Sequence, residues 1–452
     1  MRLILQWIVN IGYIIAGILF LPIVVYRMIT SKRYLRGWHN RMGFIPKRYG
    51  QRPAIWIHAV SVGEVNAVRS LIKKLMQQLP FHEIFVSTTT DTGYDRAVSL
   101  YGEDNVFFFP FDFSLSIAKA LKRLNPQLII LAELEVWPNL VLQAKKRNIP
   151  VILINGRITE KSLERYKIVS GLINRIFNQL DCVMVQDNTY RQRFESLGVE
   201  PDKIIITGSL KWDGASSAES IVNQDRLAKA LGINMQHPLI VAGSTGDDLE
   251  EEAILRAYQQ LRSRFSNLQL AIIPRKPERF DHVANIISSR GFYPVRRSQY
   301  PDGTQGPSGI ISGKTAIVLG DTMGELRKFY ALARVVFVGR TLVEMGGSDV
   351  MEVAALAKPI VIGQHYDNFK DAVEKLREAN AIEIIDKPER LAGVISEILA
   401  DATKAQTMGE NARKVVRENQ GATKKTVAKI CDILGMEYDE TERNIATPKL
   451  TS

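Results

Sequence analysis

The sequence contains few of the residues from which metal and redox centres are built. Only two cysteines, Cys182 and Cys431, occur among 452 residues, together with six histidines. The cysteines lie far apart and match no metal-binding or redox pattern, so we interpret them as buried thiols in a reducing compartment. No cluster of metal ligands is evident, and we predict a reaction that needs neither a metal ion nor another cofactor.

The common signatures of nucleotide and nucleic-acid binding are also missing. No Gly-x-Gly-x-x-Gly motif follows the first expected strand of either half, which argues against a dehydrogenase, and no Walker-type Gly-Lys-Ser/Thr loop is present. Neither zinc-knuckle spacing nor RNA-binding aromatics accompany the net charge of +11, so a nucleic acid is not expected as a partner. A basic surface of this kind suits anionic lipids or phosphorylated small molecules.

A long apolar run near the amino terminus indicates contact with a membrane. Residues 3–26 are almost wholly apolar, about the length that a helix needs to cross a bilayer. The basic residues that follow are Arg27, Lys32, Arg33, Arg36 and Arg41, against only Arg2 in front. Because positive charge stays inside, we predict a membrane-anchor helix at 1–30 in the inner membrane, with the remaining chain on the cytoplasmic face and the basic segment 27–48 against anionic lipids. A helix lying in the membrane interface is the alternative.

Short β-rich runs alternate with helical stretches over the rest of the chain, which predicts parallel, doubly wound α/β sheets. The alternation breaks in a polar stretch at 209–236, which we interpret as a linker. It separates an N-terminal domain at 31–208 from a C-terminal domain at 237–402, followed by helices at 403–436 and a flexible tail at 437–452. Two Rossmann-like domains facing a cleft, without the fingerprints above, fit a glycosyltransferase of the GT-B type, with the nucleotide sugar in the C-terminal half.

The β-rich runs define the two expected sheets. In the N-terminal domain the expected strands are 54–60, 83–88, 105–109, 127–132, 150–155, 181–186 and 203–207. In the C-terminal domain they are 238–243, 268–273, 316–319, 334–338, 359–362 and 381–385. Residues 298–312, rich in glycine, proline and serine, are expected to form a loop.

Four charged residues follow strands of the N-terminal domain. Glu64 comes after the first strand, in a small-residue turn at the start of a helix, and ligands of open α/β sheets sit at this edge. Glu133 and Glu135 follow the strand that ends near 132 and would lie on the same side if that strand continued. A neighbouring carboxylate raises the pKa of Glu64 and a helix N-terminus lowers it, so we expect a base that is ionised at neutral pH. Lys211 follows the last strand and suits a negatively charged donor.

Each of these residues also has a purely structural interpretation. Glu64 could be an ordinary carboxylate at a helix N-terminus, where the dipole favours it. One of the pair Glu133 and Glu135, with Glu135 as our first choice, could cap the helix that begins at Pro138, and Lys211 could be a solvated linker lysine.

Loops after strands in the C-terminal domain suit a phosphate. Ser244 and Thr245 offer hydroxyls and free amides ahead of a helix, although the acids at 247–252 could simply cap that helix. Arg275 could grip a phosphate with two hydrogen bonds. In the loop at 346–352, the glycines would let the backbone approach a ligand and Glu352 would accept hydrogen bonds from ribose hydroxyls.

Taken together, these segments resemble the Kdo transferases, membrane-bound enzymes that add 3-deoxy-D-manno-octulosonic acid (Kdo) to the lipid A precursor. The matching segments occur in family order and are residues 58–64, 133–139, 155–157, 208–213, 243–245, 274–280, 320–326 and 346–352. The resemblance implies a GT-B fold and an inverting transfer of Kdo from CMP-Kdo to lipid IVA in lipopolysaccharide core biosynthesis. Glu64 would be the general base, and Glu133 and Lys211 would stabilise the transition state.

The resemblance also implies a set of substrate contacts. They are Ser61, Gly63, Arg157, Ser244, Thr245, Pro274, Arg275, Met323, Gly324, Glu325, Gly346, Gly347, Asp349, Val350, Met351 and Glu352. The CMP part of the donor would lie against the segments from Pro274 to Arg275, from Met323 to Glu325 and from Asp349 to Glu352.

The sequence departs from the family pattern in the donor loops. Gly246, Lys276 and Ser348 stand where the family usually has histidines, and Asp349 stands where it has asparagine. A carboxylate near a nucleotide phosphate is repulsive unless it binds a hydroxyl or a base, so these changes bear on the donor's identity and affinity. Two alternatives therefore stay open: a GT-B transferase or epimerase using another nucleotide sugar, and a catalytically inactive, membrane-tethered nucleotide-sugar-binding protein.

Overall fold

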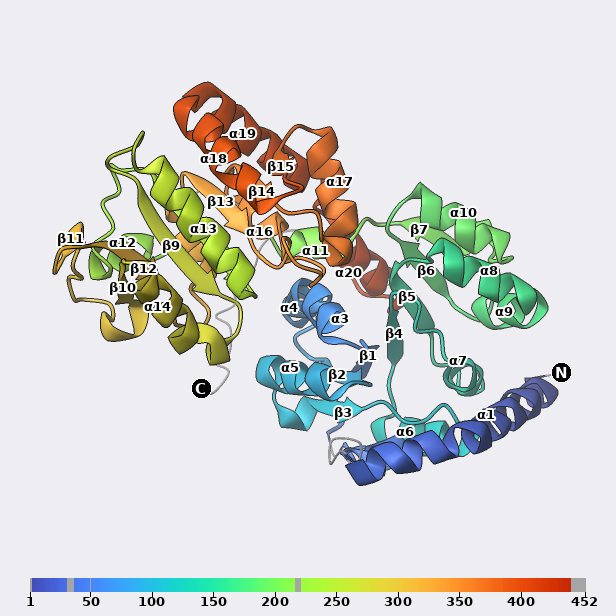
Figure 1. Cartoon of the computed structure of the whole chain (residues 1–452). Helices are drawn as coiled ribbons and strands as arrows, with labels where there is room; N and C mark the ends of the chain where they lie inside the picture. The colour runs from blue at the N-terminus through green and yellow to red at the C-terminus, as the bar shows by residue number, and fades with distance from the viewer. Residues whose placement is uncertain (1, 31–35, 49, 216–220, 440–452) are drawn as a thin grey trace. The chain divides into compact units, whose positions relative to one another are not determined.

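The computed structural model describes residues 2–30, 36–48, 50–215 and 221–439. The chain divides into two compact lobes, the first formed by residues 1–214 and 420–452 and the second by residues 215–419. Each lobe is an α/β unit built on a parallel sheet, as the alternation of strands and helices predicted (Figure 1).

The first lobe contains a seven-stranded sheet in the order β3-β2-β1-β4-β5-β6-β7, with every neighbouring pair parallel. Its strands are β1 (Ala54–His58), β2 (Glu83–Thr88), β3 (Val106–Phe108), β4 (Leu128–Ala132), β5 (Val151–Gly156), β6 (Cys182–Val185) and β7 (Ile204–Ile206). Each lies within one residue of an expected run or inside it. The central strands are buried on both faces, because helices cover both sides of the sheet. Trp56 packs in the core on one face, and its neighbours Ile55 and Ile57 pack in the core on the other.

Helices of the first lobe come from both ends of the chain. They are α1 (Arg2–Thr30), α2 (Trp38–Arg41), α3 (Val62–Ala67), α4 (Arg69–Gln78), α5 (Asp91–Tyr101), α6 (Ser114–Leu124), α7 (Pro138–Lys145), α8 (Glu160–Ile168), α9 (Ser170–Phe177), α10 (Asn188–Ser196), α11 (Leu210–Asp213) and α20 (Ala422–Ile433). The last of these packs against α4 and α11. The two cysteines are free and buried, as interpreted from the sequence.

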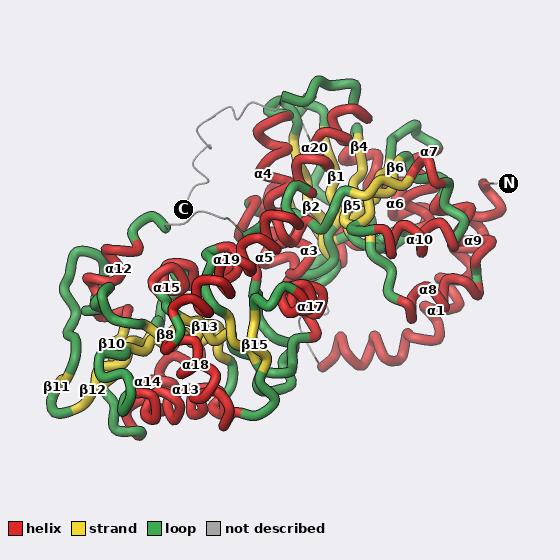
Figure 2. Tube along the Cα trace, turned by 90° about the horizontal axis from the view of Figure 1, so that it is seen from above, coloured by secondary structure: helices red, strands yellow, loops and turns green. Residues whose placement is uncertain are grey.

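In the second lobe the main sheet has the order β10-β12-β9-β8-β13-β14-β15, and β11 pairs with β12 (Figure 2). The strands are β8 (Leu239–Thr245), β9 (Gln269–Pro274), β10 (Tyr293–Arg296), β11 (Ile310–Ile311), β12 (Lys314–Leu319), β13 (Val335–Val338), β14 (Ile360–Ile362) and β15 (Ile382–Ile384). The helices are α12 (Gln224–Ala230), α13 (Asp248–Leu261), α14 (Phe280–Ser289), α15 (Leu326–Leu332), α16 (Met351–Ala355), α17 (Lys370–Glu378), α18 (Leu391–Ala400) and α19 (Ala402–Asn419).

The stretch expected as a linker is shared between the lobes. At its start, α11 buries Leu210 and Trp212 in the first lobe, whereas α12 packs against α15 in the second. Of the C-terminal helices, α19 packs against α16, and only α20 returns to the first lobe. Asp213 fixes that return, because its carboxylate accepts hydrogen bonds from the backbone N–H groups of Gly421 (2.7 Å) and Thr423. Of the predicted tail, residues 440–452 lie outside the described part.

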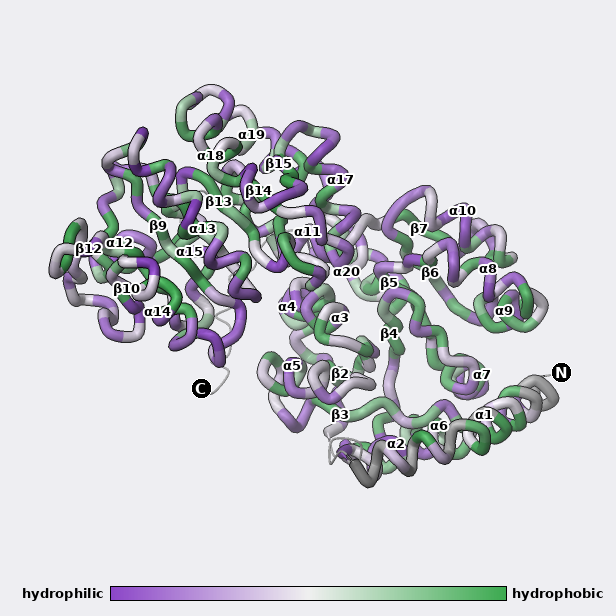
Figure 3. Tube along the Cα trace, viewed as in Figure 1, coloured by the Kyte–Doolittle hydropathy of each residue, from purple (hydrophilic) through white to green (hydrophobic). Residues whose placement is uncertain are grey.

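Helix α1 follows the predicted anchor closely and is the most apolar long helix in the colouring of Figure 3. Within the described part of the chain, no helix is long and apolar enough to count as a candidate for crossing a membrane. The basic residues Lys32 and Arg33 lie outside the described residues.

Candidate active site

Glu64 lies where the turn after β1 enters α3. Ser61 is the N-cap of that helix, and its hydroxyl accepts a hydrogen bond from the backbone N–H of Glu64. The Glu64 carboxylate accepts in return from the Val60 N–H (2.9 Å) and the Ser61 hydroxyl (3.0 Å). This resembles a capping box, except that the backbone N–H belongs to the residue before the N-cap. Glu64 is therefore held as a helix-start carboxylate, yet it stays partly exposed and neither of these contacts is with a cation.

The other predicted charges gather around Glu133. Its carboxylate lies 3.3 Å from Nε of Arg157 and 3.8 Å from Nζ of Lys211. Lys211 acts on Glu64 as well, since both Lys211 and Glu133 influence its pKa. The structure thus brings together Glu64, Glu133, Lys211 and Arg157, which come from four separate segments of the sequence.

Backbone conformation at the strand ends holds this cluster. Glu133 comes directly after β4 with φ of 54°, and Asn155 lies near the end of β5 with φ of 52°. Such left-handed conformations cost energy for residues other than glycine and cluster at functional sites. The side chain of Asn155 accepts a hydrogen bond from the Leu210 N–H (3.1 Å), which fixes the start of α11 and so the position of Lys211. Because β4 ends at Ala132, strand alternation does not apply to Glu133 and Glu135.

Burial is the main influence on the pKa of Glu64 and raises it. The Val60 N–H opposes this shift, Glu133 adds to it, and the Ser61 hydroxyl and Lys211 again oppose it. A carboxylate with a raised pKa and no direct cation is a better proton acceptor than an exposed one while it stays ionised.

Glu135 does not cap α7, and the alternative proposed for it is wrong. The cap is Asp112, a residue that we did not single out from the sequence, whose carboxylate accepts from the N–H groups of Asn139 (2.9 Å) and Leu140 (2.8 Å). Glu135 instead accepts a hydrogen bond from the Trp137 indole (3.1 Å). Burial and the charge of Glu64 raise the pKa of Glu135 to about 7.

In the second lobe, residues of several predicted donor loops surround Tyr330. This buried phenol hydrogen-bonds with Ser244, and Glu352, Asp349 and Arg275 lie close enough to influence its pKa, which burial raises. Ser244 has φ of 59°, and a Cβ on Gly243 would overlap the Tyr330 ring. The sequence signal for Tyr330 was weak, because an aromatic residue in a helix is ordinarily part of the core.

The Gly246 amide, which follows Ser244 and Thr245, is not available to an anion. Glu250, a fully buried carboxylate of α13, accepts hydrogen bonds from the N–H groups of Gly246 (3.0 Å), Arg340 (2.8 Å), Thr341 (2.9 Å) and Leu342 (3.1 Å). Glu250, one of the acids at 247–252, therefore occupies an amide of the loop where the sequence suggested a phosphate.

Two further acidic residues of the predicted site are engaged within the lobe. Asp349 accepts from the Met351 N–H (2.8 Å) at the start of α16. Glu325 accepts from both Nε (2.8 Å) and Nη2 (3.0 Å) of Arg297 and from Thr322 and Lys328. Burial alone would raise the pKa of Glu325, but these hydrogen bonds outweigh it and lower that pKa to about 2.

Among the remaining predicted contacts, three glycines can reach a ligand only through the backbone. Gly324, Gly346 and Gly347 have φ of 85°, 74° and 81°, which glycine adopts without strain. Val350 and Met351 are buried, so their side chains belong to the core. Arg275 is exposed, as is Gly63 in the first lobe.

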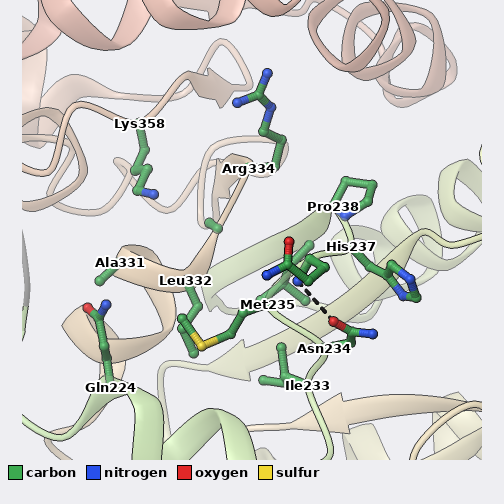
Figure 4. Close-up of a pocket in the computed structure, with 13 residues that line it drawn as sticks. Gln224, Ile233, Asn234, Met235, His237, Pro238, Ala331, Leu332, Arg334 and Lys358 are labelled. Carbon is green, nitrogen blue, oxygen red and sulfur yellow. Dashed lines mark hydrogen bonds between the residues drawn. The ribbon is translucent and has the colours of Figure 1, made fainter.

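A hollow lies at the amino ends of strands in the second sheet. It is lined by residues of α12, α15 and the segments that precede β8, β13 and β14, including Arg334 and Lys358 (Figure 4). The predicted donor loops follow the carboxyl ends of the strands, so this hollow is not part of the candidate site.

Comparisons with known proteins identify the family of this chain. Residues 36–214 match the family model of 3-deoxy-D-manno-octulosonic-acid transferase (kdotransferase), and residues 311–415 match that of glycosyl transferases group 1. A 3-deoxy-D-manno-octulosonic acid transferase of Haemophilus influenzae is 32% identical over 87% of this chain and 90% of its own length. One of Bordetella pertussis is 30% identical over 87% and 92%. The chain belongs to the 3-deoxy-D-manno-octulosonic acid transferase family.

The fold resembles that of a solved glycosyltransferase structure. A glycosyltransferase of Rickettsia africae, 13% identical, superposes with a TM-score of 0.55 over 85% of this chain and 99% of its own. This Kdo-transferase-family protein is therefore a glycosyltransferase with two parallel-sheet lobes of the GT-B kind.

The surroundings of Gly246 explain one departure from the family pattern. A Cβ on Gly246 would lie 2.8 Å from Cγ of Arg340 and 2.9 Å from Sδ of Met345. Arg340 has φ of 64° and donates a hydrogen bond to the Met345 carbonyl (3.0 Å). These two side chains therefore fill the space that a histidine at 246 would occupy. Lys276 and Ser348 have no comparable explanation in the structure.

Proposed function

We propose that this protein transfers Kdo from CMP-Kdo to a lipid A precursor, lipid IVA, in lipopolysaccharide core biosynthesis. Membership of the family supports the choice of donor and acceptor. The observation that carries the mechanism is the grouping of Glu64, Glu133 and Lys211 beyond the carboxyl ends of β1, β4 and β7.

In the proposed reaction, Glu64 removes the proton from a sugar hydroxyl of the acceptor. The hydroxyl oxygen attacks the anomeric carbon of CMP-Kdo on the face opposite CMP, and the bond from that carbon to the phosphate oxygen breaks. CMP departs with the bonding electrons and needs no protonation, so one base suffices where a glycosidase needs an acid as well. Lys211 stabilises developing negative charge, and Glu133 holds Lys211 and Arg157 in place.

The donor would bind in the second lobe, beside Ser244, Arg275 and Glu352. Arg275 would pair with the CMP phosphate, and Glu352 would accept hydrogen bonds from ribose hydroxyls. No metal ion or cofactor enters the proposal, so transfer should persist in excess EDTA.

The protein would act at the cytoplasmic face of the inner membrane, with α1 as its anchor and no nucleic acid as partner. The apolar sequence of α1 and the basic residues after it support this location.

A transfer assay with CMP-Kdo and tetraacylated lipid A precursor, read by mass spectrometry, tests the proposal. A mass gain of one or more Kdo units is expected, and the number of units will show how many sugars are added. If mass is gained with another nucleotide sugar but not with CMP-Kdo, the protein is instead a GT-B transferase that uses that other donor. No product with any donor would favour the inactive, nucleotide-sugar-binding protein.

A further inference from the structure

Helix α1 has its polar side against the first lobe and its apolar side outward. Among its described side chains, Gln6, Val9, Asn10 and Tyr13 are buried or half-buried. The exposed large apolar side chains are Trp7, Ile11, Ile14, Ile15, Ile18, Leu19, Ile23 and Tyr26, each at least half exposed. These positions recur every three or four residues and so share one face. Water-soluble lobes show the opposite arrangement, with the apolar face inward.

Hydrogen bonds hold the polar side of α1 to the lobe. The Asn10 amide donates to the Ser114 hydroxyl (2.8 Å) and accepts from Asn139 (3.0 Å). The Tyr13 hydroxyl donates to the buried carboxylate of Asp112 (3.0 Å). The helix therefore lies along α6 and α7 (Figure 1). A helix that left this place to cross a bilayer would carry Asn10 into hydrocarbon and leave Asp112 without the Tyr13 partner.

The charge of the surrounding segment identifies what covers the outward face. Residues 1–63 contain nine lysines and arginines and no aspartate or glutamate. A second copy of the chain would place two such segments against each other, and their like charges would repel. An anionic lipid surface satisfies both the apolar face and the positive charge.

We propose that α1 lies in the plane of the bilayer, with its outward face in the acyl boundary and its inward face bonded to the first lobe. The proposal rests on the membrane location proposed above and chooses the interfacial helix over the spanning one. It also gives Asp112 a second role, because this carboxylate caps α7 and binds α1 at once. The segment that carries Glu133 and Glu135 ends at α7 and is thereby held at a fixed height above the membrane.

Vesicle flotation with the full-length protein tests the surface. Wild-type protein should float with vesicles of phosphatidylethanolamine and phosphatidylglycerol, and less with phosphatidylcholine alone or in high salt. Ile14→Glu with Ile18→Glu should weaken binding by about tenfold or more for each side chain. Ile310→Glu, at an equally exposed isoleucine of the second lobe, should have no effect. Unchanged flotation of the double variant, with its fold verified by circular dichroism, would overturn the proposal.

Depth measurements separate the two orientations. Spin labels at Ile11→Cys and Ile18→Cys, in a Cys182→Ala, Cys431→Ala background, should report the same depth in the bilayer. A spanning helix would place the two labels about 10 Å apart in depth, because seven residues rise about 1.5 Å each. Light scattering should show monomers in detergent, and a dimer lost on Ile18→Glu would assign the face to a second copy instead. None of these measurements involves sugar transfer, so this inference can fail while the proposed function stands.

Discussion

The two lobes present their functional groups in different ways. In the first lobe, charged side chains converge: Glu133 lies beside Lys211 and Arg157, and Glu64 faces them without a cation of its own. In the second lobe, the acids Glu250, Glu325 and Asp349 are occupied by hydrogen bonds within the lobe. The first lobe thus has the groups that the proposed proton transfer needs. In the second lobe, the acids hold the loops in shape through internal hydrogen bonds.

The largest effect is expected at the proposed base. Glu64→Gln keeps the shape of the side chain but removes its basicity, and should lower the transfer rate by about 10²–10⁴-fold. Binding of CMP, measured by calorimetry, should be unchanged. Glu160→Gln is a matched control, because Glu160 is also an acid in the first turn of a helix. Retained turnover of Glu64→Gln with isolated acceptor would show that Glu64 is not the base.

Glu325 tests whether acids of the second lobe are structural. Glu325→Gln breaks its pairing with Arg297 and should lower the free energy of unfolding in urea by about 1–3 kcal/mol. The low folded pKa of Glu325 makes its contribution present above the unfolded pKa and lost as the pH falls toward 2. Glu374→Gln, at a partly exposed pair with Arg377, should cost less than about 1 kcal/mol. Unchanged stability with much weaker CMP binding would instead make Glu325 a ligand contact.

The space above Gly246 can be tested by a double-mutant cycle. Gly246→His alone should weaken CMP binding by about tenfold, because Arg340 and Met345 occupy the place of the new side chain. Arg340→Gly alone removes a cation beside the donor loops and relieves the strained φ. The double variant should bind CMP more tightly than the sum of the two single-variant effects predicts. Simple additivity in calorimetry would mean that the two positions are independent.

The pH dependence distinguishes the buried carboxylates of the first lobe from ordinary ones. A protonated Glu64 cannot act as a base, and burial raises its pKa, so transfer should begin to fall at a higher pH than an exposed glutamate would give. Glu135→Gln removes a neighbouring acid with a pKa of about 7 and should move this acidic limb by less than about one pH unit toward lower pH. A limb that begins only where an exposed glutamate titrates would contradict the raised pKa of Glu64.

The smallest effect is expected for Asp349→Asn. An amide oxygen can accept the Met351 N–H as the carboxylate does, so thermal stability should change little. Removing the negative charge should strengthen CMP binding by about threefold or less, because interactions between solvent-exposed charges are weak. A large loss of affinity would show that the Asp349 carboxylate binds the ligand directly.

Sequence reasoning located the elements better than the contacts between them. Every expected strand is present, but β10 and β11 were missed. The first contains Pro294 and has three half-buried residues among its four, and the second lies in the segment expected as a loop. Both are edge strands that obtain order from pairing with β12, and local composition does not report such pairing.

The sequence by itself determined which residues follow the carboxyl ends of the strands, because hydrophobic runs and small-residue turns are local. That was enough to select Glu64, Glu133 and Lys211. Only the tertiary structure decided which charges are paired, because the partners lie far apart in the sequence. These pairs are Arg157 with Glu133, Arg297 with Glu325, and Tyr13 with Asp112. It also decided which face of α1 points outward, because an apolar helix can bury or expose its face depending on what the lobe offers its polar side.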